Sequence, residues 1–187
     1  TDLVEDHNGN LWLAGFYQGI SRYNLSKGKV KRYPHPLKGP GHAYGLLKVM
    51  KDPQGQIWVG TKEHGLGHYI EDQDRFEYFY LKNPSPDDVS KRGPAVVSDI
   101  AIDQQDHNIL WVSGYDGLYA FHKKQKTFER YTYYAAESKK QITPFLAVET
   151  DFTSKIWLGT WSDGLVSFDK NTKTFASYPY ADAEVPT

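Results

Sequence analysis

The stretch that decides the fold is IWVGTKEHGLGHY at residues 57–69, because the chain contains it in four versions. The other three are LWLAGFYQGISRY at residues 11–23, LWVSGYDGLYAF at residues 110–121 and IWLGTWSDGLVSF at residues 156–168. Each version has a tryptophan between aliphatic residues, then small residues, then a glycine followed by Leu or Ile. A repeat of this kind indicates that one supersecondary unit is used several times along the chain.

The second glycine of each version keeps all four copies in one register. These glycines are Gly19, Gly65, Gly117 and Gly164. The tryptophans upstream of them are Trp12, Trp58, Trp111 and Trp157, spaced by 46, 53 and 46 residues. An aspartate opens each unit, at Asp6, Asp52, Asp103 and Asp151. Because these positions recur, we assign them structural roles: the tryptophans pack between units and the aspartates shape turns.

Each period has room for four short strands. They are an apolar stretch before the aspartate, the tryptophan segment, the glycine-leucine segment and a closing segment with two aromatic or aliphatic residues. Four antiparallel strands in about 40 to 50 residues are typical of a β-propeller blade and not of a helical solenoid. We therefore predict an all-β chain of four blades from a larger propeller. The predicted blades span approximately residues 1–36, 44–83, 95–134 and 143–180.

Composition and charge exclude several classes of function. The 187 residues carry 22 basic and 23 acidic side chains, so no positive field attracts nucleic acid. The chain lacks cysteine, which removes disulfides and zinc-thiolate sites. No apolar run approaches the roughly 20 residues that span a bilayer, and the first residues do not resemble a signal peptide. We expect no nucleic-acid partner and no membrane insertion by this segment.

Two copies carry a family resemblance. Residues 58–69 read Trp-Val-Gly-Thr-x-x-x-Gly-Leu-x-x-Tyr and residues 157–168 read Trp-Leu-Gly-Thr-x-x-x-Gly-Leu-x-x-Phe, which resembles the two-component regulator propeller repeat. The first copy departs from it with Ala14-Gly15 and the third with Ser113-Gly114. The resemblance covers nearly the whole chain. It implies a segment of the periplasmic sensor region of a hybrid two-component system histidine kinase, a group common in bacteria that forage on glycans.

The positions that vary among the copies are the candidates for binding. They lie in the turn after the tryptophan strand and include flat aromatic and polar side chains, which suit a sugar. Because strand direction alternates, this turn shares an edge of the blade with the long, dissimilar connections between blades. Packing around a central channel is the competing explanation. The predicted ligand-binding residues are Phe16, Tyr17, His64, Tyr115, Trp161 and Asp163.

The residues do not predict catalysis, a cofactor or a metal site. On a strand, His64 and His68 stand about 13 Å apart and cannot share one ion. Asp6-x-x-Gly9-x-x-Trp12 is similar to the aspartate boxes of sialidase propellers, although a structural turn explains it better. Glu63, Asp116 and Asp163 are possible carboxylates of a glycosidase, but nothing in the sequence brings two of them together.

Three functions therefore stay open: a ligand-sensing segment that binds an oligosaccharide or another small molecule, a protein-interaction propeller, and a glycan-cleaving propeller. A run of four blades also leaves an apolar face at each end. We expect an open arc whose ends are covered by the remaining blades of a longer chain or by self-association. Closure into a four-bladed ring is the alternative.

Overall fold

The computed structural model describes residues 2–15, 19–33, 46–62, 65–81, 96–134 and 144–178. Within these ranges the chain forms four separate antiparallel sheets, each with its four strands in sequence order, and one short 3-10 turn at Glu71–Gln73. No helix in the described residues is long and apolar enough to cross a membrane. The predicted all-β blade architecture is confirmed. We call the sheets blades 1 to 4.

The strands follow the order of the repeat. Blade 1 contains β1 (Asp2–Glu5), β2 (Asn10–Gly15), β3 (Gly19–Asn24) and β4 (Lys29–Tyr33). Blade 2 contains β5 (Leu46–Lys51), β6 (Ile57–Thr61), β7 (Leu66–Ile70) and β8 (Arg75–Phe79). Blade 3 contains β9 (Val97–Ile102), β10 (Ile109–Gly114), β11 (Gly117–His122) and β12 (Thr127–Tyr131). Blade 4 contains β13 (Phe145–Thr150), β14 (Lys155–Thr160), β15 (Leu165–Asp169) and β16 (Thr174–Tyr178).

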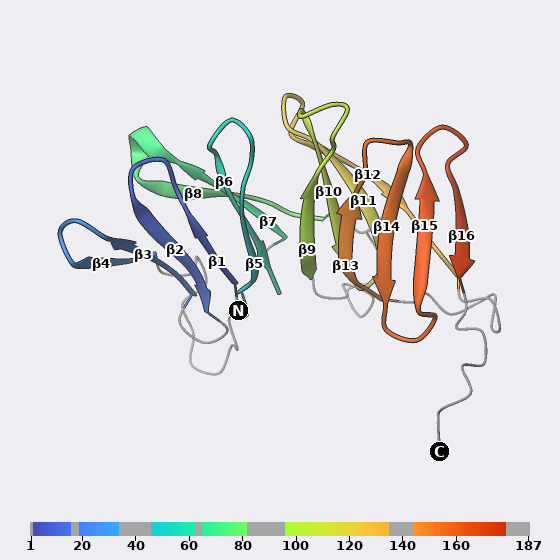
Figure 1. Cartoon of the computed structure of the whole chain (residues 1–187), viewed down its shortest axis with the longest axis horizontal. Helices are drawn as coiled ribbons and strands as arrows, with labels where there is room; N and C mark the ends of the chain where they lie inside the picture. The colour runs from blue at the N-terminus through green and yellow to red at the C-terminus, as the bar shows by residue number, and fades with distance from the viewer. Residues whose placement is uncertain are drawn as a thin grey trace, which may run out of the picture.

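The blades stand side by side in an arc. The first strands β1, β5, β9 and β13 lie next to one another in that order, and Figure 1 shows blade 1 and blade 4 at opposite ends of the array. The described residues thus form the expected open arc and not a closed four-bladed ring.

Three apolar clusters hold the arc together, one between each pair of adjacent blades. In the first, Trp12 and Tyr33 of blade 1 pack against Val59 and Tyr69 of blade 2. The same positions of blades 2 and 3 face blades 3 and 4 in the other two clusters. Each blade therefore turns its tryptophan toward the next blade, which explains why apolar residues occupy both odd and even positions of the strands.

The burial of the repeated tryptophans follows from this stacking. Trp12, Trp58 and Trp111 are 0%, 1% and 3% exposed, as the sequence predicted. Trp157 is only half-buried, because it lies on the free face of blade 4.

An aspartate holds each of these tryptophans. One carboxylate oxygen, Oδ2, accepts the indole N–H, at 2.8 Å in blade 1, 3.0 Å in blade 2, 2.8 Å in blade 3 and 3.0 Å in blade 4. The other oxygen accepts backbone N–H groups of the turn that joins the first two strands; in blade 2 these come from Gln54 and Gln56. The aspartate is therefore both the organiser of the turn and the anchor of the ring.

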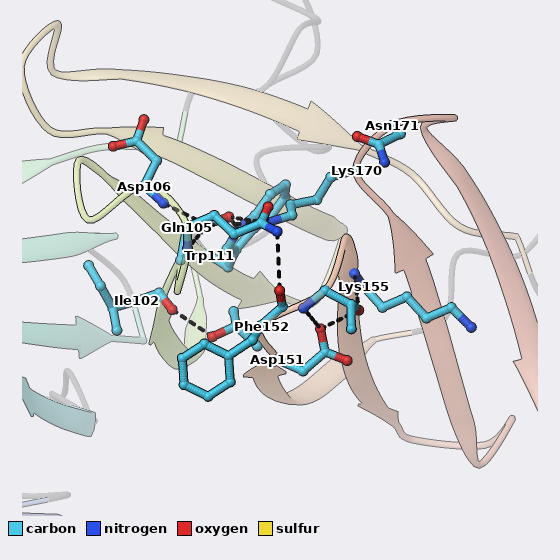
Figure 2. A network of polar contacts seen from close by, with 12 residues as sticks. Ile102, Gln105, Asp106, Trp111, Asp151, Phe152, Lys155, Lys170 and Asn171 are labelled. Carbon is cyan, nitrogen blue, oxygen red and sulfur yellow. Dashed lines mark hydrogen bonds and ion pairs between the residues drawn. The ribbon is translucent and has the colours of Figure 1, made fainter.

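At two junctions a lysine of the following blade joins this aspartate. Lys123 donates to Asp52 at 2.8 Å, and Lys170 donates to Asp103 at 2.9 Å. The second lysine also donates to Gln105 at 2.9 Å, which in turn donates to the carbonyl of Phe152 in blade 4 at 3.2 Å (Figure 2). Burial alone would raise the pKa of Asp103, but the hydrogen bonds from Trp111 and Lys170 outweigh it and hold that pKa below its ordinary value.

The repeated glycine lies at the start of the third strand of each blade. There the main chain at the end of the fourth strand approaches the glycine closely. Gly65 has φ +69°, and a Cβ there would lie 2.3 Å from the carbonyl oxygen of Phe79. At Gly117 a Cβ would lie 2.6 Å from the carbonyl oxygen of Tyr131. The position therefore needs glycine for its backbone conformation and for space.

We predict that Gly65→Ala destabilises the protein far more than Gly9→Ala. Gly9 has the same φ of +69°, but nothing lies within 4 Å of its Cβ position. The Gly9 variant carries only the left-handed backbone penalty of about 1 to 2 kcal/mol, whereas the Gly65 variant adds a steric clash of about 1 to 3 kcal/mol. Urea unfolding measures both, and equal losses would contradict the close approach of the last strand.

A second prediction concerns Asp103, whose side chain is 2% exposed. Asp103→Ala leaves the indole N–H of Trp111 and the ammonium group of Lys170 without their buried acceptor, so we expect a loss of about 3 to 5 kcal/mol in the free energy of unfolding. Asp151→Ala is the matched control, since its aspartate anchors a half-buried ring and should matter less. An equal loss in the free energy of unfolding for both variants would contradict the prediction that burial between two blades makes Asp103 more important than Asp151.

Candidate functional site

The turns between the second and third strands carry the predicted binding residues that the structure describes. Trp161 is 72% exposed and Tyr115 is 43% exposed, and Asp163 is half-buried beside the first of them. The other predicted binding residues, Phe16, Tyr17 and His64, lie outside the described residues. The same is true of Glu63 and of most of the three long connections between blades. Since neighbouring strands are antiparallel, these turns lie at the end of the blade opposite to the aspartate turns.

Hydrogen bonds hold the turn that presents Trp161. The N–H of Trp161 donates to the carbonyl of Pro144 at 3.0 Å, just before blade 4 begins, so the turn lies against the end of a connection between blades. The N–H and the hydroxyl of Thr160 both donate to the carbonyl of Gly164, at 3.0 and 2.9 Å. The same hydroxyl oxygen accepts the N–H of Asp163 at 2.8 Å. A large aromatic ring is thus exposed on a hydrogen-bonded turn.

The corresponding turn of blade 3 is held differently. Tyr119 donates its hydroxyl to the carboxylate of Asp116 at 2.7 Å, and the guanidinium of Arg130 lies 3.4 Å from the same carboxylate. Burial and the charge of Asp116 together raise the pKa of the Tyr119 hydroxyl. Asp116 therefore has structural partners, and Tyr115 beside it is the exposed side chain of this turn.

The aspartate end of the array contains a cavity that the sequence did not predict. It lies between blades 1 and 2 and has a volume of about 290 Å³. Carboxylates, carboxamides, one arginine and two histidines dominate its walls. The lining residues are Asp6, His7, Asn8, Asn10, Arg22, Gln54, Gly55, Gln56, Ile57, His68, Tyr69, Ile70, Glu71 and Asp72.

One position of the repeat differs at this junction. Lys123 and Lys170 stand six residues after the repeated glycines of blades 3 and 4, and each reaches back to the aspartate of the preceding blade. The equivalent residue of blade 2 is Glu71, which instead accepts a hydrogen bond of 2.9 Å from Asn8. This difference can be seen in the sequence by comparing the residue six positions after the repeated glycine in blades 2, 3 and 4.

A second group of polar residues closes the outer side of the same junction. The carboxylate of Asp74 accepts hydrogen bonds from the hydroxyls of Tyr33 at 2.6 Å and Tyr69 at 2.7 Å, and it pairs with Lys31. Arg22 donates to the Tyr69 hydroxyl at 2.6 Å. Burial opposes ionisation of Asp74, but the lysine and the two tyrosines hold its pKa far below the ordinary value. Within the described residues, no group of three or more histidines and carboxylates is arranged to hold a metal ion.

Neither a family model nor a curated protein matches this chain. Several solved structures do. The extracellular domain of the hybrid two component system BT4673 from B. thetaiotaomicron is 18% identical with a TM-score of 0.76, and the match covers 99% of this chain and 23% of that one. The extracellular domain of the hybrid two component system BT3049 from the same organism is 19% identical with a TM-score of 0.65, covering 94% and 23%.

An enzyme is also among the similar structures. Virginiamycin B lyase from Staphylococcus aureus is 15% identical with a TM-score of 0.54, and the match covers 97% of this chain and 70% of the lyase. The chain spans about a quarter of the length of the two extracellular domains. At these identities the similarity concerns the fold, and in its fold the chain resembles the extracellular domains of hybrid two component systems, as the repeat motif predicted.

Proposed function

We propose that this chain is a ligand-sensing segment of the periplasmic sensor region of a two-component histidine kinase, and that it binds an oligosaccharide at the turns around Tyr115 and Trp161. The fold shared with two extracellular domains of hybrid two component systems supports the sensor role. The single observation that carries the binding site is Trp161, a tryptophan 72% exposed on a hydrogen-bonded turn. Exposed aromatic rings on rigid turns suit sugars, whose faces are apolar and whose edges are hydroxylated.

The arrangement of the turn gives a mechanism. The indole face of Trp161 would stack on a pyranose ring, while the hydroxyl of Ser162 and the carboxylate of Asp163, which are hydrogen-bonded to each other at 3.0 Å, would meet its hydroxyls. Because the N–H of Trp161 donates to the carbonyl of Pro144 at the start of blade 4, a bound sugar would favour one arrangement of this turn and of the residue that it holds. Such a shift in population is the form in which a sensor segment transmits binding to the rest of a longer protein.

The similarity to virginiamycin B lyase is the observation that favours an enzyme. Its TM-score of 0.54 is lower than the 0.76 and 0.65 of the two extracellular domains. The carboxylate of Asp116, one of the candidate carboxylates, accepts a hydrogen bond from Tyr119 and forms an ion pair with Arg130. We therefore place sensing ahead of catalysis.

The end faces of the arc support a second kind of partner. On blade 1, Leu13 and Val30 are exposed and stand at the repeat positions of Val59 and Phe76, which receive blade 1 in the first cluster. On blade 4, Trp157 and Tyr178 stand at the positions of Trp12 and Tyr33, which face the next blade. Each end face thus has the pattern of an interface between blades. We propose that further blades of a longer chain, or a second copy of this chain, cover them.

Trp161→Ala tests the sugar site. We expect oligosaccharide binding, detected first on a glycan array and then by calorimetry, to weaken at least about tenfold, because a stacked aromatic surface is lost. The midpoint of thermal unfolding should change little, since the ring is exposed. Leu25→Ala, an exposed side chain at the opposite end of the blades, is the control and should leave binding unchanged. A large loss of stability with unaltered affinity would make Trp161 a structural residue.

Light scattering tests the end faces. We expect the 187-residue chain to self-associate at micromolar concentration, because two apolar faces are exposed. Leu13→Glu together with Val30→Glu places charges on the free face of blade 1 and should shift the chain toward a monomer. A chain that is already strictly monomeric would contradict association through these faces.

A further inference from the structure

The cavity between blades 1 and 2 differs in charge from the other two junctions. Asp52 and Asp103 each have a lysine ammonium group within 2.9 Å. Asp6 has only neutral donors in the described part of the chain: the indole of Trp12 at 2.8 Å, the carboxamide of Asn10 at 2.9 Å, and backbone N–H groups. The lysine position itself holds Glu71. Where the other junctions pair opposite charges, this one brings two carboxylates to the same cavity.

The cations near the cavity do not offset this charge. Arg22, the one arginine in its wall, donates to the hydroxyl of Tyr69 and lies 3.4 Å from Asp74, so its charge is directed to the outer strands. Burial lowers the pKa of His68, which stacks on Trp58 with ring centroids 4.2 Å apart, and so disfavours the charged form of its imidazole. With Asp72 also in the wall, three carboxylates and one guanidinium group line the cavity.

The remaining walls suit a small polar molecule. Carboxamides of Asn8, Gln54 and Gln56 offer donors and acceptors, and Ile57 and Tyr69 provide apolar surface between them. At the next junction, the carboxamide of Gln54 accepts a hydrogen bond from the ammonium group of Lys123 at 3.0 Å, and Gln105 does the same for Lys170. Asn8 holds the corresponding position two residues after Asp6. At two junctions, therefore, the aspartate and the residue two positions after it bind a lysine ammonium group.

We propose that the cavity between blades 1 and 2 binds the primary ammonium group of a small polar molecule, at the place that Lys123 and Lys170 occupy at the other junctions. An amino sugar and a lysine side chain share this chemistry. The ammonium group would lie between Glu71, Asp6 and the carboxamide of Asn8. Because Glu71 is exposed, salt screens the attraction and binding should be strongest at low ionic strength. This site is distinct from the sugar-binding turns, since it lies at the opposite end of the blades.

Nuclear magnetic resonance of the whole chain gives a localised test. The indole N–H of Trp12 donates to Asp6 and so reports on the cavity. Glucosamine, which carries the ammonium group, is titrated against glucose, which has a hydroxyl in its place, and Nα-acetyl-lysine methylamide represents a lysine side chain. We expect the Trp12 indole resonance to shift with one or both ammonium compounds and not with glucose. Equal shifts with glucose, or none with either ammonium compound, would overturn the proposal.

Variants at position 71 separate binding from folding. Glu71→Lys restores the lysine of the other junctions, so we expect an unchanged or higher midpoint of thermal unfolding and at least about a tenfold loss of ammonium binding. Glu71→Gln keeps the cavity, removes one charge and should weaken binding several-fold. Glu129→Gln, which removes an exposed carboxylate at the junction of blades 3 and 4, is the control and should leave ammonium binding unchanged. Undiminished binding by the Glu71→Lys variant would refute the site.

Discussion

The hydrogen bond between an aspartate carboxylate and a tryptophan indole, present in every blade, is the interaction on which the rest of the structure depends. One carboxylate organises the turn that begins the second strand and also fixes the ring that packs against the next blade. A buried carboxylate would be unfavourable without such partners. Here the indole and the backbone N–H groups of the turn supply them, and at two junctions a lysine also donates. Local turn formation and packing between blades therefore share one side chain.

The junctions are alike in their apolar clusters and different in their charges. On the outer strands, Glu77 pairs with Lys126 and Glu129 pairs with Lys173, whereas the equivalent pair of the first junction is Lys31 with Asp74. The inner lysine of the later junctions is likewise replaced by a glutamate in the first. Exchanging blades would thus place like charges opposite each other, so the ion pairs distinguish junctions that the apolar residues alone would treat as equivalent.

This separation of roles explains how a repetitive scaffold can carry specific sites. Tryptophan, aspartate and glycine hold the blades, so the differences among the copies collect at positions that the stacking leaves free. At one end of the blades these positions present Tyr115 and Trp161 to solvent. At the other end, a polar cavity lies between blades 1 and 2, where Glu71 stands at the position that holds a lysine in blades 3 and 4. Both regions lie in turns that join paired strands, which would limit the conformational entropy lost if the proposed ligands bind.

The sequence by itself determined the number of blades, the strands of each, and the packing role of Trp12, Trp58 and Trp111, because these follow from local periodicity and from a register that recurs. It also placed Trp161 in a variable turn. The tertiary structure decided what no spacing reveals: Lys123 lies 71 residues from the aspartate that it pairs with, and the two meet only because one blade is stacked on the next. The reduced burial of Trp157 has the same origin, since it depends on whether a blade stands opposite that face. The sequence contains Glu71 at the lysine position, but only the stacking of blades 1 and 2 places it beside a cavity that Asp6 also lines.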